Sequence, residues 1–193
     1  MSQQTVQRTI GIDEFVRELR HFPTSAFDRV DDIAGFLTVN AVAPDTLAPY
    51  LTWDGQHYTR NLIYKGDLFE LIALCWEVGQ VSRIHNHQGQ RCWMAVPIGC
   101  LAVQNYTVVR AGDRGYCELR EADRLVMDPR HPSAVAPETS IHAVLNLPEY
   151  GSRKSTIERA TRGSRRGFLA FSVPSPVQTR MRSPSRPTQT GAF

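Results

Sequence analysis

Apolar residues in the first 51 positions recur at the spacing of amphipathic helices. Residues 11–20 place Ile12, Phe15 and Leu19 on one helical face, because an α-helix brings positions i, i+3, i+4 and i+7 together. Acidic residues open this segment and arginines close it, an order that the helix dipole favours. The same kind of pattern predicts further helices over residues 26–38 and 44–51. We therefore expect a helical region at residues 11–51.

From residue 57 the pattern changes to short runs rich in β-branched and aromatic residues. Turn residues such as Lys65-Gly66-Asp67 and Gly112-Asp113 separate these runs. Many short strands at this spacing are typical of an antiparallel sandwich or barrel. The sequence therefore predicts a mainly β fold, with a β-barrel over residues 57–151. The predicted strands cover residues 58–64, 69–76, 81–85, 92–97, 100–109, 115–120, 124–127, 133–136 and 141–146.

Residues 152–193 differ from the rest of the chain in composition. They hold eight arginines and one lysine against one acid, a net charge of +8, so residues 1–151 carry −5 and the overall +3 combines two unlike parts. Within this tail only Gly167–Phe171 has the apolar character needed to pack, and no alternating run would close a barrel. We expect a basic, Arg/Ser/Pro-rich, divergent or disordered tail outside a domain of residues 1–151.

Composition excludes several classes of protein. No apolar run approaches the roughly 18 residues of a membrane span, and residues 1–19 lack the apolar core of a secretion signal. Cys75, Cys92, Cys100 and Cys117 contain no CxxC pair, which argues against a disulfide framework or a thiolate zinc site. We expect a cytoplasmic monomer without membrane contact. The basic tail has no interleaved aromatic residues, so nucleic-acid binding ranks last among its functions.

Three histidines form the candidate chemistry. His85 and His87 are two positions apart in a predicted strand, and such residues point to the same face. His142 lies in a second strand-like apolar run, Ile141–Asn146. A pair of alternating histidines is weak evidence for a metal site, and the third candidate strengthens it. Three neutral imidazoles suit Fe(II), Zn(II), copper or nickel alike, so the residues alone do not choose the metal.

The spacing around these histidines resembles the two motifs of the cupin superfamily. Gly79, His85, His87, Cys92 and Gly99 follow the first motif, with Cys92 where that motif has glutamate. Residues 137–146 follow the second motif, with a threonine at position 139 in place of glycine.

A cupin with three histidines, and with cysteine in place of glutamate, resembles the cysteine dioxygenase type I family. Further segments of the chain are similar to that family, over about residues 10–151: Tyr58-Thr59-Arg60-Asn61-Leu62, Leu74-Cys75-Trp76 and Ser82–His87. The resemblance implies a cupin-type jelly-roll barrel and a bacterial thiol dioxygenase. Such an enzyme uses Fe(II) to convert a small-molecule thiol, L-cysteine, and O2 to cysteine sulfinic acid.

The resemblance also implies roles for individual residues. His85, His87 and His142 would hold the iron, and Arg60 would bind the substrate carboxylate. Tyr58, on the same strand face as Arg60, would reach the substrate or Arg60 itself. A surface arginine and a half-buried strand aromatic remain the alternatives for these two residues.

Cys92 has two interpretations. In the animal enzymes the cysteine at this position forms a thioether with a tyrosine of the closing strand. No tyrosine follows Tyr150 in this chain, which favours the alternative, a small buried strand residue.

After His142 the chain departs from the family. The family continues with a Ser-x-His-x-Tyr strand, and counting on without gaps places Ser155, Ile157 and Arg159 in those three slots. We therefore expect impaired turnover. A divergent C-terminus or a change of reading frame would each explain the departure.

Two other functions remain open at this point: a non-catalytic metal- or small-molecule-binding cupin, and a 3-mercaptopropionate dioxygenase. Arg60 favours cysteine over 3-mercaptopropionate, because relatives that use the latter usually carry the carboxylate-binding arginine elsewhere.

Overall fold

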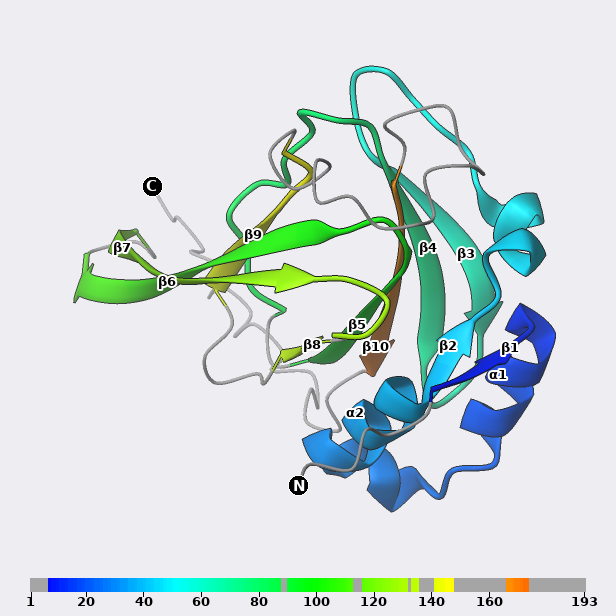
Figure 1. Ribbon diagram of the computed structural model, residues 1–193. Helices are drawn as coiled ribbons and strands as arrows, with labels where there is room; N and C mark the ends of the chain where they lie inside the picture. The colour runs from blue at the N-terminus through cyan, green and yellow to red at the C-terminus, as the bar shows by residue number, and fades with distance from the viewer. Residues whose placement is uncertain are drawn as a thin grey trace, which may run out of the picture.

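A helical layer and two β-sheets make up the protein (Figure 1). The computed structural model describes residues 7–87, 90–112, 116–131, 133–135, 141–147 and 166–173. The N-terminal layer holds two α-helices, two 3-10 helices and a parallel pair of short strands. These elements are β1 (Arg8–Ile10), α1 (Ile12–Arg20), η1 (Thr24–Asp28), α2 (Val30–Val39), β2 (Asn40–Val42) and η2 (Pro44–Tyr50).

The two sheets are antiparallel throughout and enclose the interior of a barrel. The larger has the strand order β3-β4-β10-β5-β8 and the smaller the order β7-β6-β9. In Figure 1 the β6–β7 hairpin projects to the left, away from the helical layer. The strands are β3 (Thr59–Lys65), β4 (Glu70–Trp76), β5 (Arg91–Ile98), β6 (Leu101–Ala111), β7 (Cys117–Met127), β8 (Ser133–Val135), β9 (Ile141–Leu145) and β10 (Arg166–Val173). This architecture confirms the expected mainly β, cupin-type barrel preceded by helices.

Both faces of β4, a strand of the larger sheet, are buried. On β4, Leu71 and Ala73 pack against the helical layer, whereas Leu74 and Trp76 face the barrel interior. This is the period-2 alternation of a strand with apolar residues on each side. Because neither face of β4 is in contact with water, its sequence is a nearly continuous apolar run, which is typical of a strand covered on both sides.

Aromatic contacts fasten the helical layer to the sheet. Phe27 of η1 stacks on Phe69, with ring centroids 5.4 Å apart, and meets Trp93 of β5 edge-on at 6.4 Å. The indole nitrogen of Trp93 donates a hydrogen bond to the Val30 carbonyl at 3.0 Å. The indole thus has a polar partner despite its burial, as aromatic side chains with an N–H require.

Several predicted elements have different bounds in the structure. The segment 26–38 divides into η1 and α2. The segment predicted at 44–51 is the 3-10 helix η2 (Pro44–Tyr50), which contains Pro49, and the missing N–H of this proline disfavours a regular α-helix. The strands predicted at 115–120 and 124–127 belong to one strand, β7. The strand predicted at 81–85 makes two isolated bridges to β9, at Val81 and His85. The sequence pattern did not indicate the strands β1 and β2, which have three residues each.

The expectation that residues 152–193 lie outside the barrel is wrong for Arg166–Val173. These residues form β10, which pairs with β4 on one side and β5 on the other. Leu169, for example, lies opposite Ala73 and also opposite Ala95. The prediction expected the closing strand of the barrel to alternate apolar and polar residues. A strand in the middle of a sheet that is covered on both faces has a continuous apolar run instead. The apolar run Gly167–Phe171 was therefore the signal in the sequence that could have indicated this strand. The rest of the tail, 152–165 and 174–193, lies outside the described residues.

No helix in the described part of the chain is long and apolar enough to cross a membrane.

Removing β10 should abolish stable folding. A chain ending at residue 165 leaves backbone groups of β4 and β5 without partners, and each buried unsatisfied group costs about 1–3 kcal/mol. Several such losses exceed a typical stability margin of about 5–15 kcal/mol. The control chain ends at residue 173 and keeps β10. Circular dichroism melting curves compare the two, and equal melting temperatures would contradict the central position of β10.

Candidate metal centre

Three imidazole rings converge at one cavity of the barrel, His142 buried, His87 half-buried and His85 exposed. His85 and His87 come from the segment between β4 and β5, and His142 comes from β9. One nitrogen of each ring lies within 4.8 Å of the nitrogens from the other two. The ring centroids are 4.6 Å apart for His85 and His142, 5.1 Å for His87 and His142, and 5.3 Å for His85 and His87. The structure thus brings together the three histidines that the sequence singled out.

Backbone pairing places two of these rings side by side. The His85 N–H donates to the His142 carbonyl, and the His142 N–H donates to the His85 carbonyl, each at 2.9 Å. Residues that exchange both hydrogen bonds lie directly opposite each other, with their side chains on one face. On its other side β9 pairs with β6, where Asn105 lies opposite His142. His142 therefore lies on a strand that is fixed along both edges.

Two of the three histidines, His87 and His142, are in the protonation state that binds metal. Burial lowers the pKa of His142 to about 4, and the neighbouring His85 and His87 lower it further in the same direction. Burial also lowers the pKa of His87 to about 4, with His85 and then Arg60 as smaller causes. Both rings are neutral at pH 7, and a neutral imidazole offers the lone pair that a metal requires.

The rings also have unused coordination capacity. His87 Nε2 and His142 Nδ1 are buried and have no hydrogen-bond partner, which is costly for a polar atom shielded from water. A set of three neutral imidazoles suits iron, zinc, copper or nickel. The residues present therefore fit a divalent transition metal, and the donor set does not by itself select iron.

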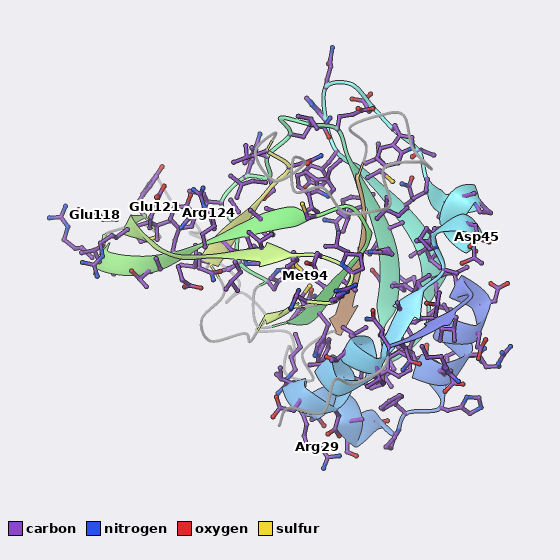
Figure 2. All side chains as sticks on the ribbon, viewed as in Figure 1. Arg29, Asp45, Met94, Glu118, Glu121 and Arg124 are labelled. Atoms are coloured by element: carbon purple, nitrogen blue, oxygen red, sulfur yellow. The ribbon has the colours of Figure 1, made fainter. Side chains whose placement is uncertain are left out.

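A cavity of about 270 Å³ adjoins the three histidines. Apolar side chains form much of its wall, among them Ile72, Leu74, Met94 and Val144. Figure 2 shows Met94 in the middle of the barrel, between the two sheets. Polar side chains, among them Arg60, Ser82 and the three histidines, form the rest of the wall, so the cavity offers a ligand both apolar and polar contacts.

Arg60 and Tyr58 both line this cavity. Arg60 lies on β3 opposite Leu74, is exposed, and its positive charge lowers the pKa of His87 and Cys92. Tyr58, half-buried, stacks on Trp76 with ring centroids 4.1 Å apart and an angle of 9° between the planes. The cavity thus combines a guanidinium with an aromatic wall beside the histidines.

Cys92 lines the same cavity but is 3% exposed. Burial raises the pKa of its thiol to about 12, although Arg60 acts in the opposite direction. The thiol is therefore protonated at neutral pH. Within the described part of β10, the residue opposite Cys92 is Ser172, so no tyrosine occupies that register position. The geometry favours the interpretation of Cys92 as a buried strand residue.

The sequence reading assigned no role to Asn146, which ties the end of β9 to the barrel. Its side-chain amide donates to the Trp76 carbonyl at 3.0 Å, and its backbone N–H donates to the Gln80 carbonyl at 3.0 Å. Its own carbonyl accepts from the Gly79 N–H at 2.7 Å. The signal available in the sequence was the second cupin motif, whose last residue is Asn146.

Acid should destabilise the metal-free protein between pH 6.5 and 4. His87 and His142 have a pKa of about 4 when folded, against 6.5 for an ordinary histidine, so in this range the unfolded chain takes up protons that the folded chain does not. The stabilisation that comes from keeping these two histidines neutral is therefore fully present above pH 6.5. The free energy of unfolding decreases as the pH falls from 6.5 toward 4. Urea unfolding at pH 7 and pH 5 measures the loss. The double variant His87→Gln, His142→Gln should lose less stability than the wild type, and equal losses would refute the assignment.

Known proteins and solved structures include several that are similar to this chain. Human "Cysteine dioxygenase type 1" is 24% identical over 148 residues, which make up 76% of this chain and 72% of the human protein. The Danio rerio protein of the same name is 26% identical over 102 residues, 52% of this chain and 51% of that protein. A solved cupin superfamily protein from Desulfitobacterium hafniense aligns with a TM-score of 0.43 and 12% identity, covering 67% of this chain and 88% of the other.

The family described as "Cysteine dioxygenase type I" matches residues 1–155. This match includes the helical layer, the cavity wall formed by β3, β4 and β5, and all three converging histidines. It ends before β10. The chain belongs to the cysteine dioxygenase type I family.

Proposed function

We propose that this protein is an Fe(II)-dependent thiol dioxygenase that converts L-cysteine and O2 to cysteine sulfinic acid. The observation that carries the proposal is the cluster of His85, His87 and His142 beside Arg60 in one cavity. A metal-binding face of neutral nitrogens and a carboxylate-binding cation are the two features that such a reaction needs. Membership of the family supports the same reaction class.

The reaction balances without an external reductant. The substrate sulfur gains both atoms of O2 and passes four electrons to them, and the thiol becomes a sulfinic acid. Bound Fe(II) would supply the coordination positions and the electron transfer that let a thiol and O2 react. The three imidazoles would hold the iron, and the protein would control placement and tuning rather than the redox chemistry itself.

Cys92 stands where other cupins have a glutamate ligand. Its thiol stays protonated because burial raises its pKa to about 12, so Cys92 is not an anionic competitor for the metal. The donor set from the protein is therefore uncharged, and the substrate thiolate would provide the negative charge that a carboxylate provides in other non-haem iron sites.

Arg60 would orient the substrate through its carboxylate. A guanidinium offers two parallel N–H donors that match the two carboxylate oxygens. Tyr58, fixed against Trp76 by stacking, would limit the space beside that carboxylate. Ile72 and Leu74 line the same cavity and would keep water away from the reacting sulfur.

The two alternative functions differ from this proposal in measurable ways. 3-Mercaptopropionate has the thiol and the carboxylate of cysteine but lacks the amine, so relative rates with the two thiols separate a cysteine dioxygenase from a mercaptopropionate dioxygenase. A non-catalytic cupin would bind metal or thiol without consuming O2.

Anaerobic loading with Fe(II) should give about one iron per chain, and adding cysteine and O2 should yield cysteine sulfinate. We expect turnover below about 1 per second, at the low end for enzymes. Ungapped counting places Ile157 and Arg159 in the slots of the family's histidine and tyrosine, and β10 (Arg166–Val173) contains neither of these two residue types. The His142→Ala variant should lose most iron and all sulfinate formation. Metal analysis, an oxygen electrode and chromatography of the sulfinate give the readouts. Iron binding without oxygen uptake would favour the non-catalytic cupin.

Arg60→Ala should lower kcat/KM for cysteine at least about thirtyfold, because losing one partner of a charge-assisted pair costs roughly 2–5 kcal/mol. Cysteamine, which lacks the carboxylate, should be affected far less. Arg60→Lys keeps the charge but not the two-pronged geometry, and should be intermediate. Arg120→Ala, on the exposed part of β7, is the control. Equal losses with cysteine and cysteamine would remove Arg60 from the carboxylate site.

A further inference from the structure

The segment that carries His85 pairs with β9 through a β-bulge. Val81 lies opposite Leu145 and His85 lies opposite His142, so four steps along one strand match three along the other. One residue is therefore extra between the two bridges, and such a residue changes which side chains face inward. The next cavity-facing position after Ser82 would be Ile84 by simple alternation, yet Ile84 is 47% exposed and is not among the residues that line the cavity. The bulge places His85 there instead: its ring lines the cavity beside His142, although one side of the residue stays exposed.

The hydroxyl of Ser82 holds the start of this bulge. The Ser82 N–H donates to the Val144 carbonyl at 2.9 Å, as in a regular ladder. The return bond is not regular, because the Val144 N–H donates to Ser82 Oγ at 2.9 Å, where a normal antiparallel pair uses the backbone carbonyl. The side chain thus provides the acceptor at the point where the ladder is interrupted. Ser82 is 7% exposed and lines the cavity.

The same hydroxyl is connected to the ring of His85. Ser82 Oγ donates to the Arg83 carbonyl at 3.0 Å, and that carbonyl lies 2.8 Å from His85 Nδ1. A carbonyl oxygen can only accept, so Nδ1 of His85 carries the proton and Nε2 keeps its lone pair. A hydrogen bond of this kind sets the tautomer and the orientation of a metal-binding histidine.

We propose that Ser82 is a positioning residue for the metal centre. Its hydroxyl holds the bulge in the conformation that turns the Arg83 carbonyl toward His85, and this carbonyl fixes the His85 ring with Nε2 available to a metal. The inference rests on the metal centre of the proposed function and adds to it a residue that is not itself a metal ligand.

The positioning role of Ser82 can be tested by measuring the affinity of the protein for Co(II). The visible absorption of bound Co(II) also reports the geometry of its ligands. Ser82→Ala should weaken Co(II) binding by about ten- to a hundredfold, the usual effect of removing a hydrogen bond that supports a metal ligand, and should change the absorption spectrum. Ser82→Thr keeps the hydroxyl and should retain most of the affinity.

Thr46→Val is the matched control. The Thr46 hydroxyl also accepts from one backbone N–H, that of Ile12 at 3.0 Å, and donates to one carbonyl, that of Ala43 at 2.7 Å. It lies in the helical layer, away from the histidines. Loss of this hydroxyl in Thr46→Val should lower the melting temperature of the protein and leave its affinity for Co(II) unchanged. Equal Co(II) affinity in Ser82→Ala and wild type would overturn the proposal, as would an equal loss in Thr46→Val.

A measurement on the wild type covers the case in which Ser82→Ala does not fold. Nitrogen-15 NMR of the metal-free protein at pH 8 should show the His85 ring proton on Nδ1, and a proton on Nε2 would overturn the proposal. This measurement also separates the two proposals. A wild-type protein that binds neither Co(II) nor Fe(II) contradicts the proposed function, while the His85 tautomer still decides whether Ser82 and Arg83 hold the ring.

Discussion

The pairing of residues 79–85 with β9 and Asn146 is the constraint on which the candidate centre depends. His85 and His142 are 57 positions apart in the sequence, and the two hydrogen bonds that they exchange bring their rings to 4.6 Å. Asn146 and Gly79 close one end of this pairing, and β6 holds the far edge of β9. Because β9 is fixed on both sides, a change at either edge would move a histidine, and a shift of one residue would turn it to the opposite face.

The helical layer and β10 make this pairing stable. A sheet with apolar residues on both faces must be covered on both sides, and the helical layer covers the face that carries Leu71, Ala73 and Trp93. The other face encloses the cavity, with Leu74, Trp76 and Met94. β10 joins β4 to β5, so the two strands next to the histidine segment belong to one continuous sheet. The basic composition of the tail conceals a strand that the barrel requires.

Burial and the charge of Arg60 set the protonation of two groups in the cavity. Arg60 and burial both lower the pKa of His87, whereas burial raises the pKa of Cys92 against the effect of Arg60. The pKa of His142 is lowered by burial and by the neighbouring histidines. A positive charge near His87 opposes protonation of that ring, and it also attracts an anionic substrate. The guanidinium thus favours a neutral His87 and a carboxylate ligand, which links the metal-binding and substrate-binding parts of the proposed site.

Local pattern in the sequence determined the helical layer, most strands, and the histidine pair His85 and His87, because strand alternation and motif spacing are properties of neighbouring residues. It also indicated Arg60 and Tyr58 through their place in the resemblance. Only the tertiary structure decided the position of β10, which depends on pairing with β4 and β5 across about 70 to 100 residues. It also decided the bulge at Ser82–Ile84, since an extra residue is defined only against the partner strand. Long-range hydrogen bonding leaves no local periodicity, and for that reason these two features could not be read from the chain alone.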